Sequence, residues 1–390
     1  MKQGWEYKKL GEVCTIERGG SPRPITDYIT DSEDGINWIK IGDAKEGSKY
    51  ITSTKEKIRP EGIKKSRLVH KGDFILSNSM SFGRPYILKV DGCIHDGWLV
   101  IHDDNEAFIK DYLYYILSSS IMYAKFSQLA VGGVVNNLNS SLVRKVAIPI
   151  PPKSTQLSIV SELDKINELI RLKKEQLKDY DNLAQSIFYE MFGDPVENEK
   201  GWEVKKLGEV CTIERGSSPR PITAYITDSK DGINWIKIGD AQEDSKYITS
   251  TKEKIKPEGL KKSRFVHKGD FILSNSMSFG KPYILKIDGC IHDGWLVIHD
   301  NNNVFIKIYL YYLLASSIMY AKFSKLAVGG VVNNLNSSLV RKVDVSIPPL
   351  PLQHLFAQRI EQIEHQKSEV AKAITDLETL LASRMQHWFE

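Results

Sequence analysis

Cysteine is scarce in this sequence, with four residues among 390 and two in each half of the chain. The four stand far apart, whereas disulfide-rich domains and zinc sites use closely spaced cysteines. We therefore expect Cys14, Cys93, Cys211 and Cys290 to be buried free thiols of a cytosolic protein.

Long apolar runs are also missing, because no window approaches the roughly 18 uninterrupted apolar residues that a membrane span needs. The first residues, MKQGWEYKKL, lack the apolar core of a signal peptide. The sequence therefore predicts a cytoplasmic protein without a membrane segment. No single charge sign dominates, since 53 Lys and Arg stand against 49 Asp and Glu and give a net charge of +4. No charged tail indicates a partner, although a basic surface can still form locally.

Familiar catalytic motifs are absent as well. The sequence has no GxxxxGK[ST] phosphate loop, no GxGxxG turn and no HExxH helix. It also lacks the NPPY or DPPY stretch of enzymes that methylate an exocyclic base amine. We expect no catalytic residue, no metal site and no cofactor bound by this chain.

The repeated segment IHDGWLVIHD (94–103 and 291–300) is the one stretch that suggests metal ligands. Its histidines, His95 and His102, are seven residues apart along what reads as a single strand. At ~3.3 Å per residue they would lie roughly 23 Å apart with side chains on opposite faces. The segment is therefore interpreted as a structural strand.

A long internal repeat dominates what the sequence does contain. The stretch AVGGVVNNLNSSLVRKV occurs at 130–146 and again at 327–343, a shift of 197 residues. At the same shift, residues 5–146 and 202–343 align without a gap and differ at 18 of 142 positions. Residues 153–192 and 350–389 share length and apolar pattern but few identities. A period of this size indicates tandem duplication of a globular domain followed by a helical arm.

The globular part mixes strand and helix signals. The runs at 36–42, 73–79, 86–90 and 98–102 are rich in β-formers and are bounded by Gly, Asp or Pro. Residues 108–126 predict one or two helices. The fold class is therefore α+β, with mixed α/β globular domains.

Each arm begins after a proline-rich joint and carries apolar residues at heptad spacing. An amphipathic helix of this length cannot bury its apolar stripe alone, so the two helices are expected to pack together; alternatively, each arm folds onto its own domain. The predicted interface residues are Ile159, Leu163, Ile166, Ile170, Leu177, Tyr180, Ile187, Phe356, Ile360, Ile363, Val370, Ile374, Leu377 and Leu381, with Lys173, Lys367 and Arg384 as polar exceptions.

Three loop-like segments carry side chains suited to nucleic acid: ERGGSPRP (17–24), KKSRLVHKGD (64–73) and SNSMSFGRP (77–85). Asn78 suits adenine edges, Arg84 suits guanine, and serines and cations suit phosphates. Each segment taken alone can instead be a solvated turn or surface charge, but together and duplicated they favour a phosphate-facing surface. The stretch 130–146 can be a phosphate-binding loop or a connector. The candidate residues are Arg18, Ser21, Arg23, Lys40, Arg67, Lys71, Asn78, Ser79, Ser81 and Arg84, and in the second copy Arg215, Ser218, Arg220, Lys237, Arg264, Lys268, Asn275, Ser276, Ser278 and Lys281.

The order of these parts resembles the DNA-specificity subunit of type I restriction–modification systems. The resemblance covers essentially the whole chain. It rests on WIKIGDA (38–44), KGDFILSNS (71–79) and the two joints, IPIPPKSTQ (148–156) and IPPLPLQ (347–353). It implies target-recognition domains at 1–150 and 194–347, with spacer helices at 151–193 and 348–390 forming an antiparallel coiled coil of pseudo-twofold symmetry.

The same resemblance implies that this chain is a non-catalytic subunit that works together with other subunits. Double-stranded DNA and two modification (methyltransferase) subunits would be partners, and a restriction/motor subunit can join them. S-adenosylmethionine would be bound by the methyltransferase partners. Because the two domains are nearly identical, we expect a near-palindromic DNA site, with like half-sites inverted around an unread gap. The competing hypotheses are a duplicated coiled-coil scaffold or adaptor without DNA readout, and an enzyme whose site escapes motif recognition.

Overall fold

The structure is a computed structural model that describes residues 4–45, 47–78, 83–129, 138–242, 245–275, 280–327 and 335–390. The chain forms two compact units, 1–174 with 372–390 and 175–371. Each unit therefore combines one globular domain with parts of two long helices, α5 (Lys153–Phe192) and α10 (Leu350–Phe389). Within the described residues, no helix has the length and apolar character needed to cross a bilayer.

The first domain alternates short strands with a few helices. Its elements are β1 (Glu6–Lys9), α1 (Leu10–Val13), β2 (Thr15–Arg18), β3 (Ile29–Thr30), β4 (Ile36–Ile39), β5 (Tyr50–Ile51), β6 (Glu56–Ile58), β7 (Arg67–Val69), β8 (Phe74–Ser77), β9 (Pro85–Leu88), β10 (Gly92–Ile94), β11 (Trp98–His102), α2 (Lys110–Ser118), α3 (Ser120–Leu129), α4 (Ser140–Arg144) and β12 (Ala147–Ile150).

The second domain repeats this order. Its elements are β13 (Glu203–Lys206), α6 (Leu207–Val210), β14 (Cys211–Arg215), β15 (Ile226–Thr227), β16 (Ile233–Ile236), β17 (Tyr247–Ile248), β18 (Glu253–Ile255), β19 (Arg264–Val266), β20 (Phe271–Ser274), β21 (Pro282–Leu285), β22 (Gly289–Ile291), β23 (Trp295–Asp300), α7 (Lys307–Ala315), α8 (Ser317–Ala327), α9 (Ser337–Arg341) and β24 (Asp344–Ile347).

The described part of each domain contains two five-stranded sheets and a two-stranded ribbon. In the first domain the sheets have the orders β2-β11-β8-β9-β5 and β3-β6-β4-β10-β7, and β1 pairs with β12. Strand β11 is buried on both faces, which explains its continuous apolar run. Leu99 on one face belongs to the core shared with α2 and α3, and Val100 on the other belongs to the core shared with the second sheet.

The segment IHDGWLVIHD is not one strand, so that prediction was wrong. Gly92–Ile94 and Trp98–His102 form separate strands in different sheets, and a turn at Asp96–Gly97 separates them. The Asp-Gly pair is a strong turn signal that outweighed the β-rich residues around it. The predicted helical run at 108–126 is confirmed as two helices, α2 and α3, which meet at Ser119.

The four cysteines are buried free thiols, as predicted. Burial raises the pKa of Cys14 and of Cys211 to about 12, and nearby carboxylates add to the shift.

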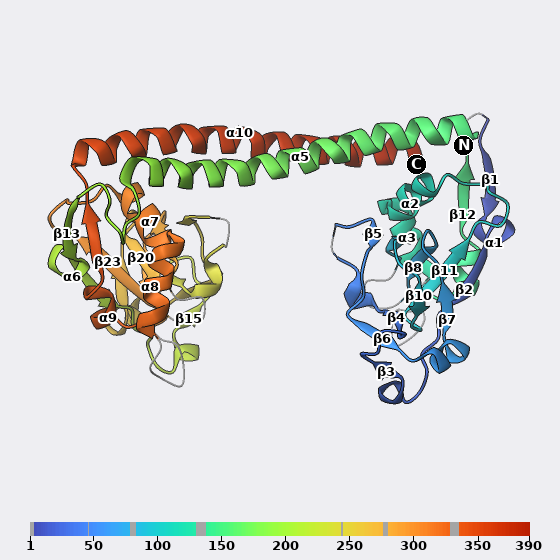
Figure 1. Cartoon of the computed structure of the whole chain (residues 1–390), viewed down its shortest axis with the longest axis horizontal. Coiled ribbons are helices and arrows are strands. Elements are labelled where there is room, and N and C mark those ends of the chain that lie inside the picture. The colour runs from blue at the N-terminus through green and yellow to red at the C-terminus, as the bar shows by residue number, and fades with distance from the viewer. Residues whose placement is uncertain are drawn as a thin grey trace. The chain divides into compact units, whose positions relative to one another are not determined.

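The long helices run side by side in opposite directions within each unit (Figure 1). In unit 1, Arg384 of α10 pairs with Glu162 of α5, and Lys174 of α5 pairs with Glu378 at 2.8 Å. In unit 2, Lys367 of α10 pairs with Asp181 of α5 at 2.5 Å. Two of the polar exceptions in the heptads, Lys367 and Arg384, therefore link the helices by ion pairs.

The heptad stripe also packs against the globular domains. Ile159 and Leu163 are fully buried in the core of the first domain, where Phe389 from the end of α10 joins them. Phe356, Ile360 and Ile363 occupy the matching core of the second domain. The alternative that each arm folds onto its own domain is thus correct for the first turns of each helix. Those turns follow directly from the proline joint and cover an apolar face that would otherwise be exposed.

The middle of the stripe and its later turns are less uniform. Ile166, Ile170, Val370 and Ile374 are buried, with exposed fractions of 6–8%. Leu177, Tyr180, Ile187, Leu377 and Leu381 are only half-buried. Phe188 was not among the predicted interface residues, yet it is 1% exposed and packs edge-on against Phe356, with ring centres 5.7 Å apart.

Candidate functional site

Asp96 and its counterpart Asp293 each contact three of the predicted candidate residues of their domain. Asp96 follows β10 in the tight turn that leads into β11. The Ser21 hydroxyl donates to its carboxylate at 2.7 Å, and the Arg18 Nε donates to its backbone carbonyl at 2.9 Å. Arg23 approaches the same carboxylate at 3.5 Å. Three candidates from the segment 17–24 are therefore joined by one aspartate, two through its carboxylate and one through its backbone carbonyl.

The second domain repeats the cluster around Asp293. Ser218 donates to the carboxylate at 2.6 Å, and the Arg215 Nε donates to the backbone carbonyl at 2.8 Å. Arg220 lies 3.8 Å from the carboxylate, and its side chain is 82% exposed, as is that of Arg23. Because such exposed ion pairs are weak, both guanidinium groups remain available to an incoming anion.

The Asp96 carboxylate is kept charged by its neighbours. The hydrogen bond from Ser21 is the main reason that its pKa lies below the ordinary range, with nearby His95 and Arg18 acting in the same direction. The pKa of Asp293 is lowered as well, by Ser218, His292 and Arg215 against the opposing effect of burial. A charged carboxylate in this place orients the arginines around it.

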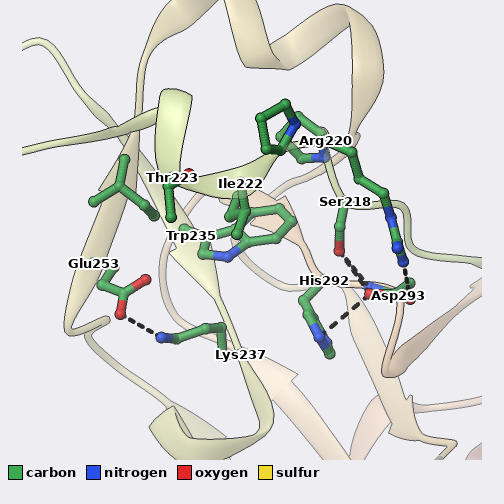
Figure 2. A pocket seen from close by; sticks show the side chains of 12 residues that line it. Ser218, Arg220, Ile222, Thr223, Trp235, Lys237, Glu253, His292 and Asp293 are labelled. Carbon is green, nitrogen blue, oxygen red and sulfur yellow. Dashed lines mark hydrogen bonds and ion pairs between the residues drawn. The ribbon is translucent and has the colours of Figure 1, made fainter.

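A cavity lies beside each of these clusters. The one in the second domain has a volume of about 810 Å³, and the one in the first domain about 660 Å³. Figure 2 shows Trp235 between the Lys237–Glu253 ion pair on one side and Ser218, Arg220 and Asp293 on the other. Proline and isoleucine side chains from the segment 219–226 form the apolar wall. The matching cavity in the first domain has Trp38, Lys40 and Glu56 in the same places.

The histidine that precedes each central aspartate lines the same cavity. His95 accepts a hydrogen bond at Nδ1 from the Gly97 backbone at 2.6 Å, and its ring centre lies 6.1 Å from that of Trp38. Within the described parts of the chain, no three His, Cys, Asp or Glu side chains come together as a metal site. His95 thus belongs to the wall of an apolar cavity with a cationic rim.

The remaining candidates are dispersed. Arg67 pairs with Glu17 at 2.9 Å, and Arg264 pairs with Glu214 at 2.7 Å, each next to the Asp-centred cluster of its domain. Lys71 and Lys268 are exposed and lie at turns that are held by Asp91 and Asp288.

The segment 77–85 is only partly described. Arg84 is exposed, Lys281 is half-buried, and the backbone N–H of each donates to a serine hydroxyl at 3.0 Å. Ser79, Ser81, Ser276 and Ser278 lie outside the described residues, as does most of the repeated stretch that begins at 130 and 327.

The side chains of Asn78 and Asn275 are buried in this structure and are not accessible to a base. They are 1% and 0% exposed, and the amide of Asn78 donates to the Asp96 carbonyl at 2.9 Å. The backbone carbonyl of Asn78 also accepts from Leu138 at 2.9 Å. Both asparagines therefore act as structural ties at this turn.

Neither the central aspartates nor the cavities were predicted from the sequence. The only signal was the Asp-Gly turn in IHDGWLVIHD, because the cavity residues come from segments as distant as 21–29, 38–40 and 95–96. Their approach depends on the parallel pairing of β10 with β4, which places His95 beyond the end of Trp38–Ile39.

Comparison with known proteins shows related chains. The sequence model of the family described as "Type I restriction modification DNA specificity domain" matches residues 2–179 and 199–378. The type I restriction enzyme MjaIX specificity subunit of Methanocaldococcus jannaschii is 26% identical over 249 residues, which cover 59% of this chain and 57% of that protein. The putative type I restriction enzyme MjaX specificity subunit of the same organism is 24% identical and covers 98% of this chain and 93% of the relative.

The fold also matches a solved structure. A chain from a study of complex assembly and conformational transition of the type I R-M system has a TM-score of 0.68 at 20% identity. The match covers 99% of this chain and 97% of that chain. This likeness supports the arrangement of mixed α/β domains with long paired helices.

Proposed function

The chain belongs to the family of type I restriction–modification DNA specificity proteins, and we propose that it binds DNA and directs methyltransferase and restriction subunits to their target. The observation that carries this proposal is the family match itself, which occurs twice, once over each globular domain. Each globular domain is then a recognition domain for one half of a bipartite site. The near-identity of the two, with 18 differences in 142 positions, supports two like half-sites.

The Asp-centred clusters support contact with the DNA backbone. Arg23 and Arg220 extend into solvent, and a carboxylate holds each at the rim of an apolar cavity. Arginine at such a position neutralises phosphate and releases counterions, so affinity falls steeply with salt. A scaffold or adaptor without DNA readout would show no such salt dependence.

The half-sites are proposed to be inverted around an unread gap. Supporting this, α5 and α10 run antiparallel within each unit, and each recognition domain joins its helix through an equivalent proline joint. Two nearly identical readers that bind as a twofold pair would read half-sites of opposite orientation, as in other twofold DNA-binding proteins. The target would therefore be near-palindromic.

Catalysis and cofactor binding are assigned to partner subunits. The chain is proposed to be a non-catalytic cytoplasmic subunit that recruits two methyltransferase subunits, and these subunits would bind S-adenosylmethionine. A restriction/motor subunit would complete the restriction enzyme.

Selection from a random DNA pool, followed by mapping of methylated adenines, tests the proposal. The chain is purified with its methyltransferase partners, and bound duplexes are sequenced at low and at moderate salt. We expect two like half-sites in inverted orientation and methylation only when the partners are present. Two unrelated half-sites would contradict the palindrome, and methylation by the purified chain alone would contradict the non-catalytic role.

A further inference from the structure

In each unit a lysine of the recognition domain lies against a long helix, half-buried in unit 1 and buried in unit 2. The side chains of Lys49 in unit 1 and Lys246 in unit 2 are 17% and 7% exposed. Three tyrosines of the same domain surround each ammonium group. For Lys246, the ring centres of Tyr247, Tyr311 and Tyr312 lie 5.9, 5.8 and 5.3 Å from Nζ. A buried ammonium group still needs a carboxylate, because aromatic faces replace only part of its hydration.

The carboxylates that meet these lysines differ between the two units. Lys49 pairs with Asp111 of its own domain and lies 3.9 Å from Asp164 of α5. In the second copy, Ile308 occupies the position of Asp111, so Lys246 has no equivalent carboxylate there. Its carboxylate comes from α10 instead, where Glu364 lies 2.8 Å from Nζ. The second lysine therefore depends on a helix for the countercharge that the first lysine finds within its own domain.

Glu364 also connects the domain to the second helix. It lies 3.9 Å from Lys367, which pairs with Asp181 of α5 at 2.5 Å. Domain, α10 and α5 are thus joined by alternating charges along Lys246, Glu364, Lys367 and Asp181. If the domain slid by one helical turn, about 5.4 Å, the ammonium group would lose this partner although its side chain is only 7% exposed. Glu364 is itself 34% exposed, so the pair lies at the edge of this contact. Fixing register is the best-attested role of polar groups at packed interfaces.

We propose that Lys246 and Glu364 are positioning residues that fix the orientation of the second recognition domain on α10. The replacement of Asp111 by Ile308 makes this domain rely on its helix, so the two nearly identical readers are held by different contacts. This inference rests on the proposed function, because the orientation of a reader matters when it sets the gap between two half-sites. Burial lowers the pKa of Lys246, consistent with the need for the nearby carboxylate.

The test compares gap tolerance in the full chain bound to its methyltransferase partners. The probes are duplexes with the selected half-sites, and the gap is set at the preferred length or changed by one base pair. Glu364→Gln removes the charge with little change of shape. We expect the preference for the native gap to fall on the order of tenfold, the equivalent of about 1.4 kcal/mol. Adding Ile308→Asp rebuilds the arrangement of the first domain and should restore the preference.

Matched variants separate positioning from general stability. Glu361→Gln removes a charge from an exposed site one turn earlier on α10 and should leave the gap preference unchanged. Lys246→Met with Glu364→Leu replaces the ion pair by apolar contacts, which can preserve stability. This double variant keeps the test valid if Glu364→Gln fails to fold. It should fold but lose the gap preference, and a preserved preference would overturn the proposal.

A readout without DNA keeps this inference distinct from the proposed function. Amide hydrogen exchange of residues 245–248 and 360–368 should be faster in Glu364→Gln and should return to the wild-type rate when Ile308→Asp is added. If the wild-type complex selects no bipartite site, the proposed function fails. The hydrogen-exchange rates then still test whether Lys246 and Glu364 position the domain. Exchange that is unaltered in Glu364→Gln would then overturn the positioning role.

Discussion

At the scale of single residues, the histidines beside the central aspartates make the fold sensitive to acid. Burial lowers the pKa of His95 below its ordinary value of 6.5, while Asp96 and Asp43 oppose the shift and Lys40 adds to it. Burial likewise lowers the pKa of His292. The unfolded chain has ordinary imidazoles and therefore binds more protons at pH values between the lowered pKa and 6.5. The free energy of unfolding therefore falls as the pH drops through this window.

This dependence is measurable by thermal unfolding at about pH 7.5 and about pH 5.5. The melting temperature of the wild type should be lower at the lower pH. The decrease should be smaller in the double variant His95→Gln with His292→Gln. His354→Gln, at an exposed position on α10, serves as the control and should behave as the wild type. Equal acid sensitivity in the double variant and the wild type would assign the effect to other groups.

At the scale of elements, a buried glutamine closes each joint between a recognition domain and its long helix. Gln156 is 1% exposed, and its amide donates to the carbonyls of Ala107 and Pro151, both at 3.0 Å. Its carbonyl oxygen accepts from the Ile109 backbone at 2.7 Å. Gln353 makes the same three contacts in the second unit. One side chain therefore ties the start of the helix to the loop before α2 and to the proline segment.

Replacing Gln156 by Ala should be costly, because three backbone groups lose their partner. We expect the free energy of unfolding to fall by about 2–4 kcal/mol. Gln366→Ala, at an exposed position of α10, should change it by less than about 0.5 kcal/mol. Denaturant unfolding measures both variants, and equal small effects would show that water replaces the lost contacts.

Sequence patterns predicted the helices and strands better than they predicted the contacts between them. Strand β11 and both long helices were predicted within two residues of their ends, because apolar runs, proline joints and heptads are local signals. The division of the heptad stripe between helix pairing and domain cores was not fully anticipated, since Ile159 or Phe356 fits either environment. The Asp96 cluster was missed because the segment 17–24 meets the turn before β11 only through the pairing of β2 with β11.

At the scale of the whole molecule, the duplication makes the symmetry of the DNA site testable. Arg84 and Lys281 occupy equivalent positions just before equivalent strands, β9 and β21. Arginine can donate two parallel hydrogen bonds to a guanine, whereas lysine acts as a point charge. If these residues read the same position of their half-sites, that position should be strict in one half and relaxed in the other.

Exchanging Arg84 and Lys281 tests whether these two residues set how strictly one base pair is read. Lys281→Arg should make both halves strict and Arg84→Lys should relax both, each by about 1–3 kcal/mol of discrimination at one base pair. Random-pool selection with each variant measures the change. Arg59→Lys, an equally conservative change at another differing position, is the control and should leave that base pair unaltered. A selected site that stays the same in all three variants would show that the single difference at 84 and 281 does not touch base readout. The near-symmetry of the target would then depend on the residues that the two recognition domains share.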